Sequence, residues 1–269
     1  MSICYIDFRY ITFSATCFIQ HSQPSLNNKD ELRLTTTVER MQEIKSCYSA
    51  QLIIAALNEE QGIGLTITEM KDVLGDIPTL VVDGKSADKT VELSKNLGAT
   101  VITQDGKGKG DALAKAIENL DSGTDYVILT DADYTYPAEY IPDMIKILEE
   151  NPDVGMVCGN RFNGNVDRKA LYRIFHIGNK LLAFAHKALN GIALEDPLTG
   201  LRVVRTEILP QWHIESKGFD IEIELNNFVQ KQGYTTREIL INYRERLGEK
   251  KLRARDGFTI LKRILKDIF

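Results

Sequence analysis

The chain has 269 residues, 43% hydrophobic and 26% charged, which suits one globular α/β domain with appendages. Its formal net charge of −5 argues against a general nucleic-acid-binding protein, because such proteins present basic surfaces that neutralise phosphates. No run of about 18 uncharged apolar residues is present, so a membrane-spanning helix is not expected and any membrane contact would be peripheral.

Residues 1–48 show no sustained helical or strand periodicity, and we expect them to form an extension outside the main fold. The apolar stretch near the start carries Asp7 and Arg9 where a signal peptide has its uninterrupted core, and translation from Met41 is one hypothesis for this region. Three of the four cysteines also lie in the first 47 residues, without CxxC spacing. Neither a zinc site nor a disulfide framework is therefore expected, and a reducing, cytosolic setting fits best.

From residue 51 onward, apolar runs typical of buried strands alternate with segments of helical spacing. The expected strands are 51–57, 79–83, 100–103 and 125–130, and the expected helices are 59–74, 86–98 and 108–120. Ser86 is a plausible N-cap and Gly98 a plausible C-cap of the second helix. This alternation predicts βαβ units and hence a Rossmann-like, mainly parallel sheet flanked by helices.

Polar residues follow three of these strands: Asn58 and Glu59, then Asp83, then Asp131 with Asp133. Ligands of such sheets bind beyond the carboxyl ends of the strands, so these side chains are candidates for one site. Asp and Asn are also common turn and cap residues, which is the alternative for each residue taken alone.

The Asp131-Ala132-Asp133 sequence places two carboxylates directly after a strand, where they can converge on one hard cation such as Mg²⁺ or Mn²⁺. A cation placed there would bridge a diphosphate and stabilise the charge that grows on it as a leaving group. The glycines and lysines of 106–111 open a helix whose amides favour anions, but the spacing is not that of a Walker A loop. Nor do the four histidines have the spacing of a metal site.

Eight ordered blocks between residues 51 and 262 resemble glycosyltransferase family 2, and within it the dolichyl- or polyprenyl-phosphate sugar synthases. The blocks are AALNEE, VVDGKSADKT, GKGDAL, VILTDADYTYPAEYIP, GNRF, DPLTGLRVVR, GFDIEIEL and INYRERLGEKK. Two positions depart from the family pattern: Gly84 replaces an acidic residue, and Thr135 stands where some mannosyl-phosphate synthases have Gln, which leaves a third metal ligand open. The resemblance implies a GT-A fold at 49–241, followed by a basic loop and an amphipathic helix at 242–269.

The resemblance also implies a UDP- or GDP-sugar donor, a polyprenyl or dolichyl phosphate acceptor and inversion at the anomeric carbon. The residues implied to bind the nucleotide-sugar are Ala56, Leu57, Asn58, Glu59, Asp83, Lys109, Asp131 and Ala132. Asp131 and Asp133 would serve the metal and the reaction, and Asp196 is the carboxylate to nominate if a base is needed; a turn role before Pro197 is the alternative. The arginines implied to hold the acceptor phosphate are Arg161, Arg173, Arg202, Arg244 and Arg246.

Two segments mix apolar and basic residues in a helical pattern: 171–190 and the C-terminal tail, where Phe258, Leu261, Ile264, Leu265 and Ile268 share a face. The last 28 residues hold nine Lys or Arg against four Asp or Glu. Basic amphipathic helices lie in membrane interfaces, so we expect peripheral attachment at the cytoplasmic face of the membrane; packing of these faces on the sheet is the alternative. A family 2 enzyme acting on a small molecule or glycan, and a noncatalytic sugar-nucleotide-binding subunit, also remain open.

Overall fold

A computed structural model describes residues 48–162, 170–249, 251 and 256–266, with the side chains of 170–175 left out. The predicted N-terminal extension, the hypothetical start at Met41 and three of the cysteines lie outside the described residues.

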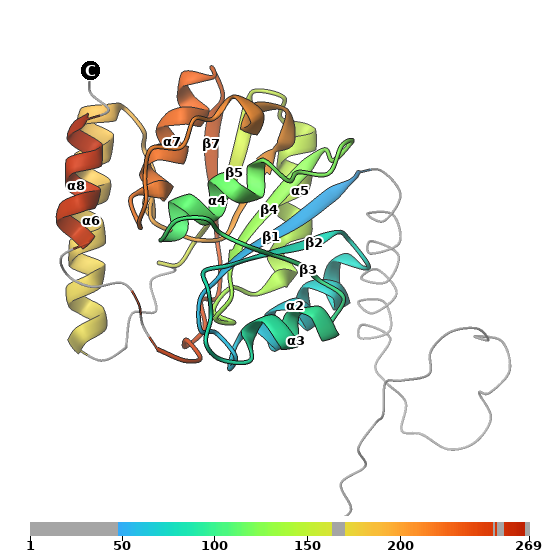
Figure 1. The fold of residues 1–269 in the computed structure, drawn as a ribbon. Helices are drawn as coiled ribbons and strands as arrows, with labels where there is room; N and C mark the ends of the chain where they lie inside the picture. The colour runs from blue at the N-terminus through green and yellow to red at the C-terminus, as the bar shows by residue number, and fades with distance from the viewer. Residues whose placement is uncertain (1–47, 163–169, 250, 252–255, 267–269) are drawn as a thin grey trace, which may run out of the picture. The chain divides into compact units, whose positions relative to one another are not determined.

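A seven-stranded sheet with the order β3-β2-β1-β4-β6-β5-β7 forms the centre of the domain (Figure 1). Its strands are Ala50–Ala56 (β1), Thr79–Asp83 (β2), Thr100–Thr103 (β3), Tyr126–Asp131 (β4), Val154–Asn160 (β5), Arg202–Arg205 (β6) and Thr235–Leu240 (β7). All neighbouring strands are parallel except β6, which runs antiparallel to both β4 and β5. The predicted mainly parallel sheet is thus confirmed.

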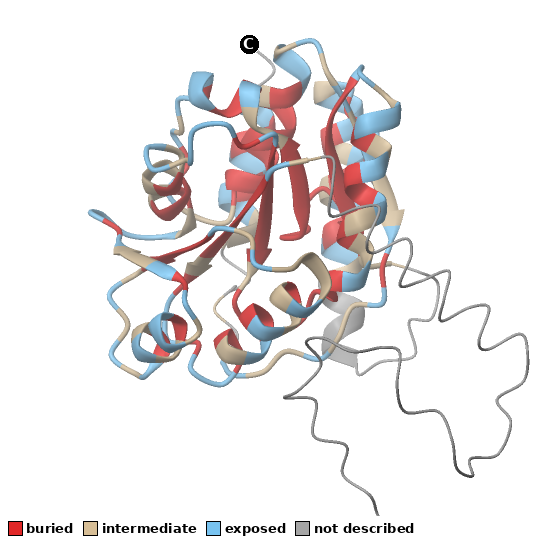
Figure 2. Ribbon diagram, turned by 90° about the vertical axis from the view of Figure 1, so that its right-hand side faces the viewer, coloured by how far each residue is buried: buried red, intermediate tan, exposed pale blue. Residues whose placement is uncertain are grey.

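Successive residues of the central strands face opposite sides of the sheet, as the two-residue period of a strand requires. In β1, Leu52 and Ile54 belong to the core cluster that packs against α2 and α5, whereas Ile53 belongs to the cluster that packs against α4 and α7. Figure 2 shows the strands as the most continuously buried part of the domain. The central strands are therefore covered on both faces, and acidic side chains lie at or directly after the carboxyl ends of β1, β2 and β4.

The described helices include the predicted ones: the first three begin one to four residues later than predicted, and the helix predicted over 171–190 begins one residue earlier. They are Ile63–Leu74 (α2), Thr90–Asn96 (α3), Lys109–Ile117 (α4), Ile141–Glu150 (α5), Ala170–Asn190 (α6), Ile221–Lys231 (α7) and Asp256–Lys266 (α8). Ser86 is not an N-cap: α3 starts four residues later, and the Ser86 hydroxyl accepts a hydrogen bond from the Asn58 N–H. The C-cap of α3 is Leu97 rather than Gly98; Gly98 follows directly with φ +80°, the left-handed conformation that ends a helix.

Helices α6 and α8 lie side by side at one side of the domain (Figure 1). Ile260 and Ile264 of α8 pack against Leu182 and Ala185 of α6, which shows that Ile264 belongs to the buried side of the tail helix rather than to an exposed one. Ile268 lies outside the described residues. Among the helices that the structure describes, none combines the length and apolar character needed to cross a bilayer.

Candidate active site

The loops after β1 and β2 are tied together at the carboxyl edge of the sheet. The side-chain oxygen of Asn58 accepts a hydrogen bond from the Ala87 N–H at 2.8 Å, and the backbone N–H of Asn58 donates to the Ser86 hydroxyl. The Asp83 carboxylate accepts from the N–H groups of Lys85 and Ser86. Asn58 therefore connects the two loops, and Asp83 shapes the turn after β2. Both loops lie at the carboxyl edge of the sheet, where ligands of such sheets bind.

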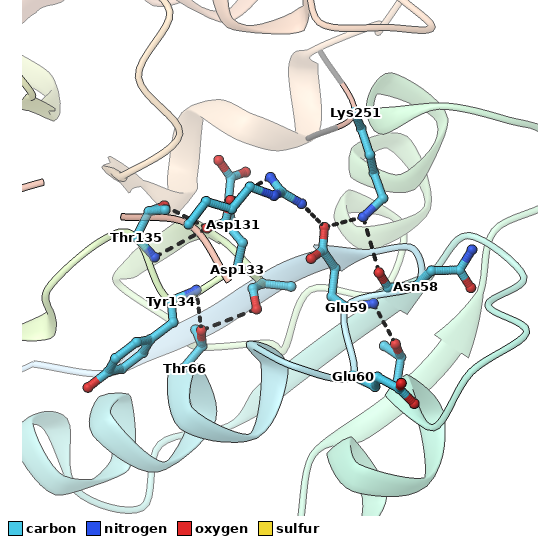
Figure 3. Close-up of polar contacts among 12 residues, drawn as sticks. Asn58, Glu59, Glu60, Thr66, Asp131, Asp133, Tyr134, Thr135 and Lys251 are labelled. Carbon is cyan, nitrogen blue, oxygen red and sulfur yellow. Dashed lines mark hydrogen bonds and ion pairs between the residues drawn. The ribbon is translucent and has the colours of Figure 1, made fainter. Parts of the chain in front are cut away.

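Three residues other than glycine have positive φ in the described chain, and all lie in loops at this edge: Asn58, Lys85 and Tyr134. Such backbone conformations are unfavourable for L-residues and concentrate at functional sites. Tyr134 follows the paired aspartates directly, and its N–H donates to the Thr66 hydroxyl of α2 (Figure 3). The loop after β4 is thereby fixed against the start of α2.

Asp131 is bound by a lysine that is itself held between two carboxylates. Lys109 at the start of α4 places Nζ 2.7 Å from Oδ1 of Asp131 and 2.7 Å from Oε1 of Glu222 on α7. Burial raises the pKa of Asp131, but the charge and hydrogen bond of Lys109, together with the charges of Arg161 and Arg246, more than offset burial, so the pKa lies below its ordinary value. Asp131 is thus maintained as a carboxylate. Glu222 was not among the predicted site residues.

Asp133 is buried and carries two different partners. Thr135 donates its hydroxyl and its N–H to Oδ1, and the Arg246 guanidinium lies 2.6 Å from Oδ2. Burial and the nearby charge of Asp131 raise the pKa of Asp133 above its ordinary value. Thr135, the position at which the sequence left a third metal ligand open, thus orients Asp133 through two hydrogen bonds.

Residues 242–249 and Lys251 lie against the ends of β1 and β4, which are followed or closed by acidic residues. The Arg244 N–H donates to the Thr135 carbonyl, and the Leu247 N–H donates to the Asp133 carbonyl. The cations of this segment converge on Glu59, which forms ion pairs with both Arg246 and Lys251 (Figure 3). The predicted basic loop is therefore in contact with the segment Asp131–Asp133.

Two glycines allow close backbone approach around the aspartates. A Cβ at Gly200 would lie 2.5 Å from Oδ2 of Asp131, and a Cβ at Gly62 would lie 2.7 Å from the Ala132 carbonyl oxygen. The Gly200 N–H donates to the Tyr136 hydroxyl at 2.7 Å, which fixes the distance between the two loops. Any larger residue at Gly200 would therefore displace the carboxylate of Asp131.

Arg161, directly after β5, forms a bidentate ion pair with the buried Asp196, at 2.6 and 2.7 Å. Its guanidinium also lies over the Tyr243 ring, 5.5 Å from the ring centre. Tyr243 in turn packs against Tyr136 in the loop that follows the paired aspartates, with ring centres 5.1 Å apart, and the charge of Arg161 helps to lower the pKa of Asp131. Because both Asp196 oxygens bind Arg161, these contacts favour a positioning role for Asp196 over proton abstraction.

The other predicted arginines divide into distinct environments. Arg202 is 2% exposed and donates to the carbonyls of Thr199 and Pro197, so its guanidinium stabilises the interior. Arg244 pairs with Glu69 of α2 and stacks on the Tyr134 ring, next to the site. The side chain of Arg173 lies outside the described residues.

The glycine-rich start of α4 is covered by protein. The Gly110 N–H donates to the Lys217 carbonyl, and Cβ atoms at Gly108 and Gly110 would lie within 2.0 Å of carbonyl oxygens of 216–217. These glycines therefore permit close packing of the chain between η2 (Thr206–Gln211) and α7. The interpretation of the helix start as an anion site is not supported at Gly110.

Comparisons with known proteins agree with this geometry. The family model described as Glycosyl transferase family 2 matches residues 51–211. A dolichyl-phosphate hexose transferase of Haloferax volcanii is 34% identical over 75% of this chain and 85% of its own length. An undecaprenyl-phosphate mannosyltransferase of Micrococcus luteus is 27% identical over 74% and 86%. The glucosyl-3-phosphoglycerate synthase of Mycobacterium tuberculosis, solved with Mn²⁺, UDP-glucose and phosphoglyceric acid, has a TM-score of 0.65 at 20% identity, covering 86% and 83%.

The sheet topology and the structural neighbours show that the domain has the GT-A fold. The chain belongs to glycosyltransferase family 2. The predicted family, fold and enzyme class are confirmed.

The donor set of the site fits a hard divalent cation. Asp131 and Asp133 offer carboxylate oxygens from one strand end, and no group of three or more acidic, histidine or cysteine side chains suited to a metal occurs in the described part of the chain. Mg²⁺ and Mn²⁺ sites of this kind use one or two carboxylates and take further ligands from phosphates and water. The residues present therefore suit a cation that is shared with a diphosphate.

Proposed function

We propose that this enzyme transfers a hexose from a UDP- or GDP-sugar to the phosphate of a polyprenyl phosphate at the cytoplasmic face of a membrane. The observation that carries the proposal is the convergence of Asp131 and Asp133 with the guanidinium groups of Arg161 and Arg246. Carboxylates suit the metal and diphosphate of the donor, whereas arginines suit a second phosphate. The names of the two polyprenyl-phosphate relatives support the same acceptor.

In the proposed reaction, an oxygen of the acceptor phosphate forms a bond to the anomeric carbon while the bond from that carbon to the donor diphosphate breaks. The bonding electrons leave with the nucleoside diphosphate, and attack from the opposite face inverts the configuration. A phosphate is already anionic at neutral pH, so no side chain has to remove a proton from it. This agrees with the bidentate Arg161 pair on Asp196, which keeps that carboxylate occupied.

The paired aspartates would hold Mg²⁺ or Mn²⁺, which stabilises the negative charge on the leaving diphosphate. Lys109 holds one oxygen of Asp131, and Thr135 holds one oxygen of Asp133. Each carboxylate is therefore oriented by a second group, an arrangement that fixes ligand geometry in metal sites. In this proposal Lys109 acts on the donor through Asp131.

Two cations of the C-terminal loop, Arg246 and Lys251, would provide the remaining positive charge for the donor. Arg246 and Lys251 neutralise Asp133 and Glu59 in the structure, and a bound diphosphate would attract the same two side chains. Asn58 and Asp83 shape the loops on which the nucleoside would lie. Ala56, Leu57 and Ala132 would then contribute backbone and apolar surface to the same pocket.

The acceptor preference can be tested by following nucleotide release from a panel of UDP- and GDP-sugars with Mg²⁺. Polyprenyl phosphate should stimulate release from one donor strongly, whereas the corresponding polyprenol should not, because it lacks the anionic group that Arg161 would bind. Arg161→Gln should raise the KM for polyprenyl phosphate with a smaller effect on donor hydrolysis. Equal stimulation by the alcohol, or stimulation only by a water-soluble acceptor, would favour a family 2 enzyme with a different acceptor.

A further inference from the structure

Large apolar side chains on the outer sides of α6 and α8 are exposed to solvent. Of the ten large hydrophobic residues exposed in the described chain, seven lie on these two helices, so they form a patch. On α6, Ile177, Leu181 and Phe184 are 67–70% exposed and recur with the spacing of one helical stripe. On α8, Phe258 is 80% exposed and shares a stripe with Leu261 and Leu265.

The two stripes lie on the same side of the helix pair. Asn190 at the end of α6 donates to the Ile264 carbonyl near the end of α8, so the helices run in the same direction (Figure 1). On α6 the exposed residues precede the contact residues Leu182 and Ala185 by one position. On α8 the exposed Leu261 and Leu265 follow the contact residues by one. Each residue turns an α-helix by about 100°. For two helices that run in the same direction and face each other, one position before the contact on α6 and one position after the contact on α8 therefore point to the same side of the pair.

This α6–α8 face, defined by the six apolar residues of the two stripes, is bordered by positive charge. Lys180, Lys187 and Lys262 are exposed beside the stripes, and residues 170–190 contain no Asp or Glu. The remaining charges near the C-terminal end of α8 are already paired, since Arg263 and Lys266 bind Glu215. A basic apolar face on a protein of net charge −5 is complementary to an anionic bilayer, which takes up the apolar side chains and attracts the lysines.

The α6–α8 face also begins next to the proposed acceptor arginine. Phe162, which follows Arg161, packs its ring 4.4 Å from the ring of His176, and His176 directly precedes the first residue of the α6 stripe. One turn further on, Asn179 donates to the carbonyl of Glu195, the neighbour of Asp196. A lipid phosphate bound at Arg161 would therefore lie at the border of this face.

We propose that the α6–α8 face is the surface on which the enzyme docks onto an anionic bilayer, with the acceptor phosphate entering the site beside Arg161. This inference rests on the proposed function for the identity of the acceptor. Docking places the carboxyl edge of the sheet close to the headgroups, so the polyprenyl chain stays in the bilayer while its phosphate reaches the site.

The test compares the full chain with Phe184→Glu and Phe258→Glu, each changing one exposed ring of the face. Leu65→Glu is the matched control, because Leu65 is an exposed apolar residue on α2, remote from α6 and α8 (Figure 1). Co-sedimentation uses vesicles of phosphatidylcholine with roughly one third phosphatidylglycerol. Each face variant should bind about tenfold more weakly or worse, since a large apolar side chain no longer enters the interface, while the control binds like wild type.

Activity separates this inference from the proposed function. The face variants should lose transfer to polyprenyl phosphate in vesicles in proportion to binding, but keep transfer to a short, water-soluble isoprenyl phosphate. Vesicle binding equal to wild type in both face variants would overturn the docking surface. If these variants also lost self-association, the face would instead be assigned to contact with a second copy of the chain. Wild-type enzyme that binds vesicles through this face but modifies neither acceptor would refute the proposed function alone.

Discussion

Replacing Lys109 by methionine would show how much the buried charge network contributes to the fold and to Asp131. Methionine keeps an unbranched stem but removes the ammonium group that lies 2.7 Å from carboxylates of both Asp131 and Glu222. Breaking a buried ion pair by removing one partner typically costs about 3–5 kcal/mol. Because Asp131 is 32% exposed, water solvates part of its charge, and we expect a loss of about 2–3 kcal/mol in the free energy of unfolding.

Urea unfolding followed by the fluorescence of Trp212, the single and largely buried tryptophan, measures this loss. The double variant Lys109→Met/Glu222→Gln should recover at least half of it, because one of the two uncompensated carboxylates has been removed. The same Lys109→Met protein should require more Mg²⁺ or Mn²⁺ for half-maximal activity, since Asp131 is no longer oriented. Stability within about 0.5 kcal/mol of wild type, or no recovery in the double variant, would refute the assigned role of the network.

Three further variants test other parts of the site. Gly200→Ala should lower kcat at least tenfold with little change in the melting temperature, because its Cβ would displace Asp131; activity and thermal melts check this, and full activity would contradict the close approach. Arg246→Gln should raise the KM for the donor nucleotide-sugar several-fold in steady-state kinetics, and an unchanged KM would remove this residue from the donor site. Glu69→Gln should cost about 0.5–1 kcal/mol at pH 7 by breaking the partly exposed pair with Arg244. Burial raises the pKa of Glu69, but its hydrogen bonds and the charge of Arg244 lower that pKa below its ordinary value. The contribution of the pair to stability is therefore present above the unfolded-state pKa and disappears as the pH falls through the lower folded-state pKa. Urea unfolding of wild type and Glu69→Gln should show a smaller difference in stability at pH 3 than at pH 7.

The strand pattern and the candidate edge could be predicted because they depend on local sequence. The run 79–83 is apolar and ends at Asp83, and the structure gives β2 the same bounds. The paired aspartates were placed at the end of a strand by the uninterrupted apolar residues before them, and β4 ends at Asp131. In such cases burial of a short apolar run determines both the element and the position of the polar residue that follows it.

Contacts between distant parts of the chain could not be predicted in the same way. The antiparallel direction of β6 depends on the path of the chain between β5 and β6, and the sequence of Arg202–Arg205 resembles that of any buried strand. The resemblance implied Arg202 as an acceptor residue, but its guanidinium donates to the interior carbonyls of Thr199 and Pro197. Glu222 is recognisable only once α7 brings it to Lys109, since no local pattern distinguishes it from the other acids of the block GFDIEIEL.

The central claim is that sugar is transferred to a lipid phosphate at the paired aspartates. Mass spectrometry of polyprenyl phosphate recovered after incubation with enzyme, Mg²⁺ and each nucleotide-sugar tests it most directly, with Asp131→Asn as the matched control. The account predicts a lipid whose mass has increased by one hexose with a single donor, and none with Asp131→Asn. An unmodified lipid alongside a glycosylated water-soluble acceptor, or a product formed equally by Asp131→Asn, would contradict it.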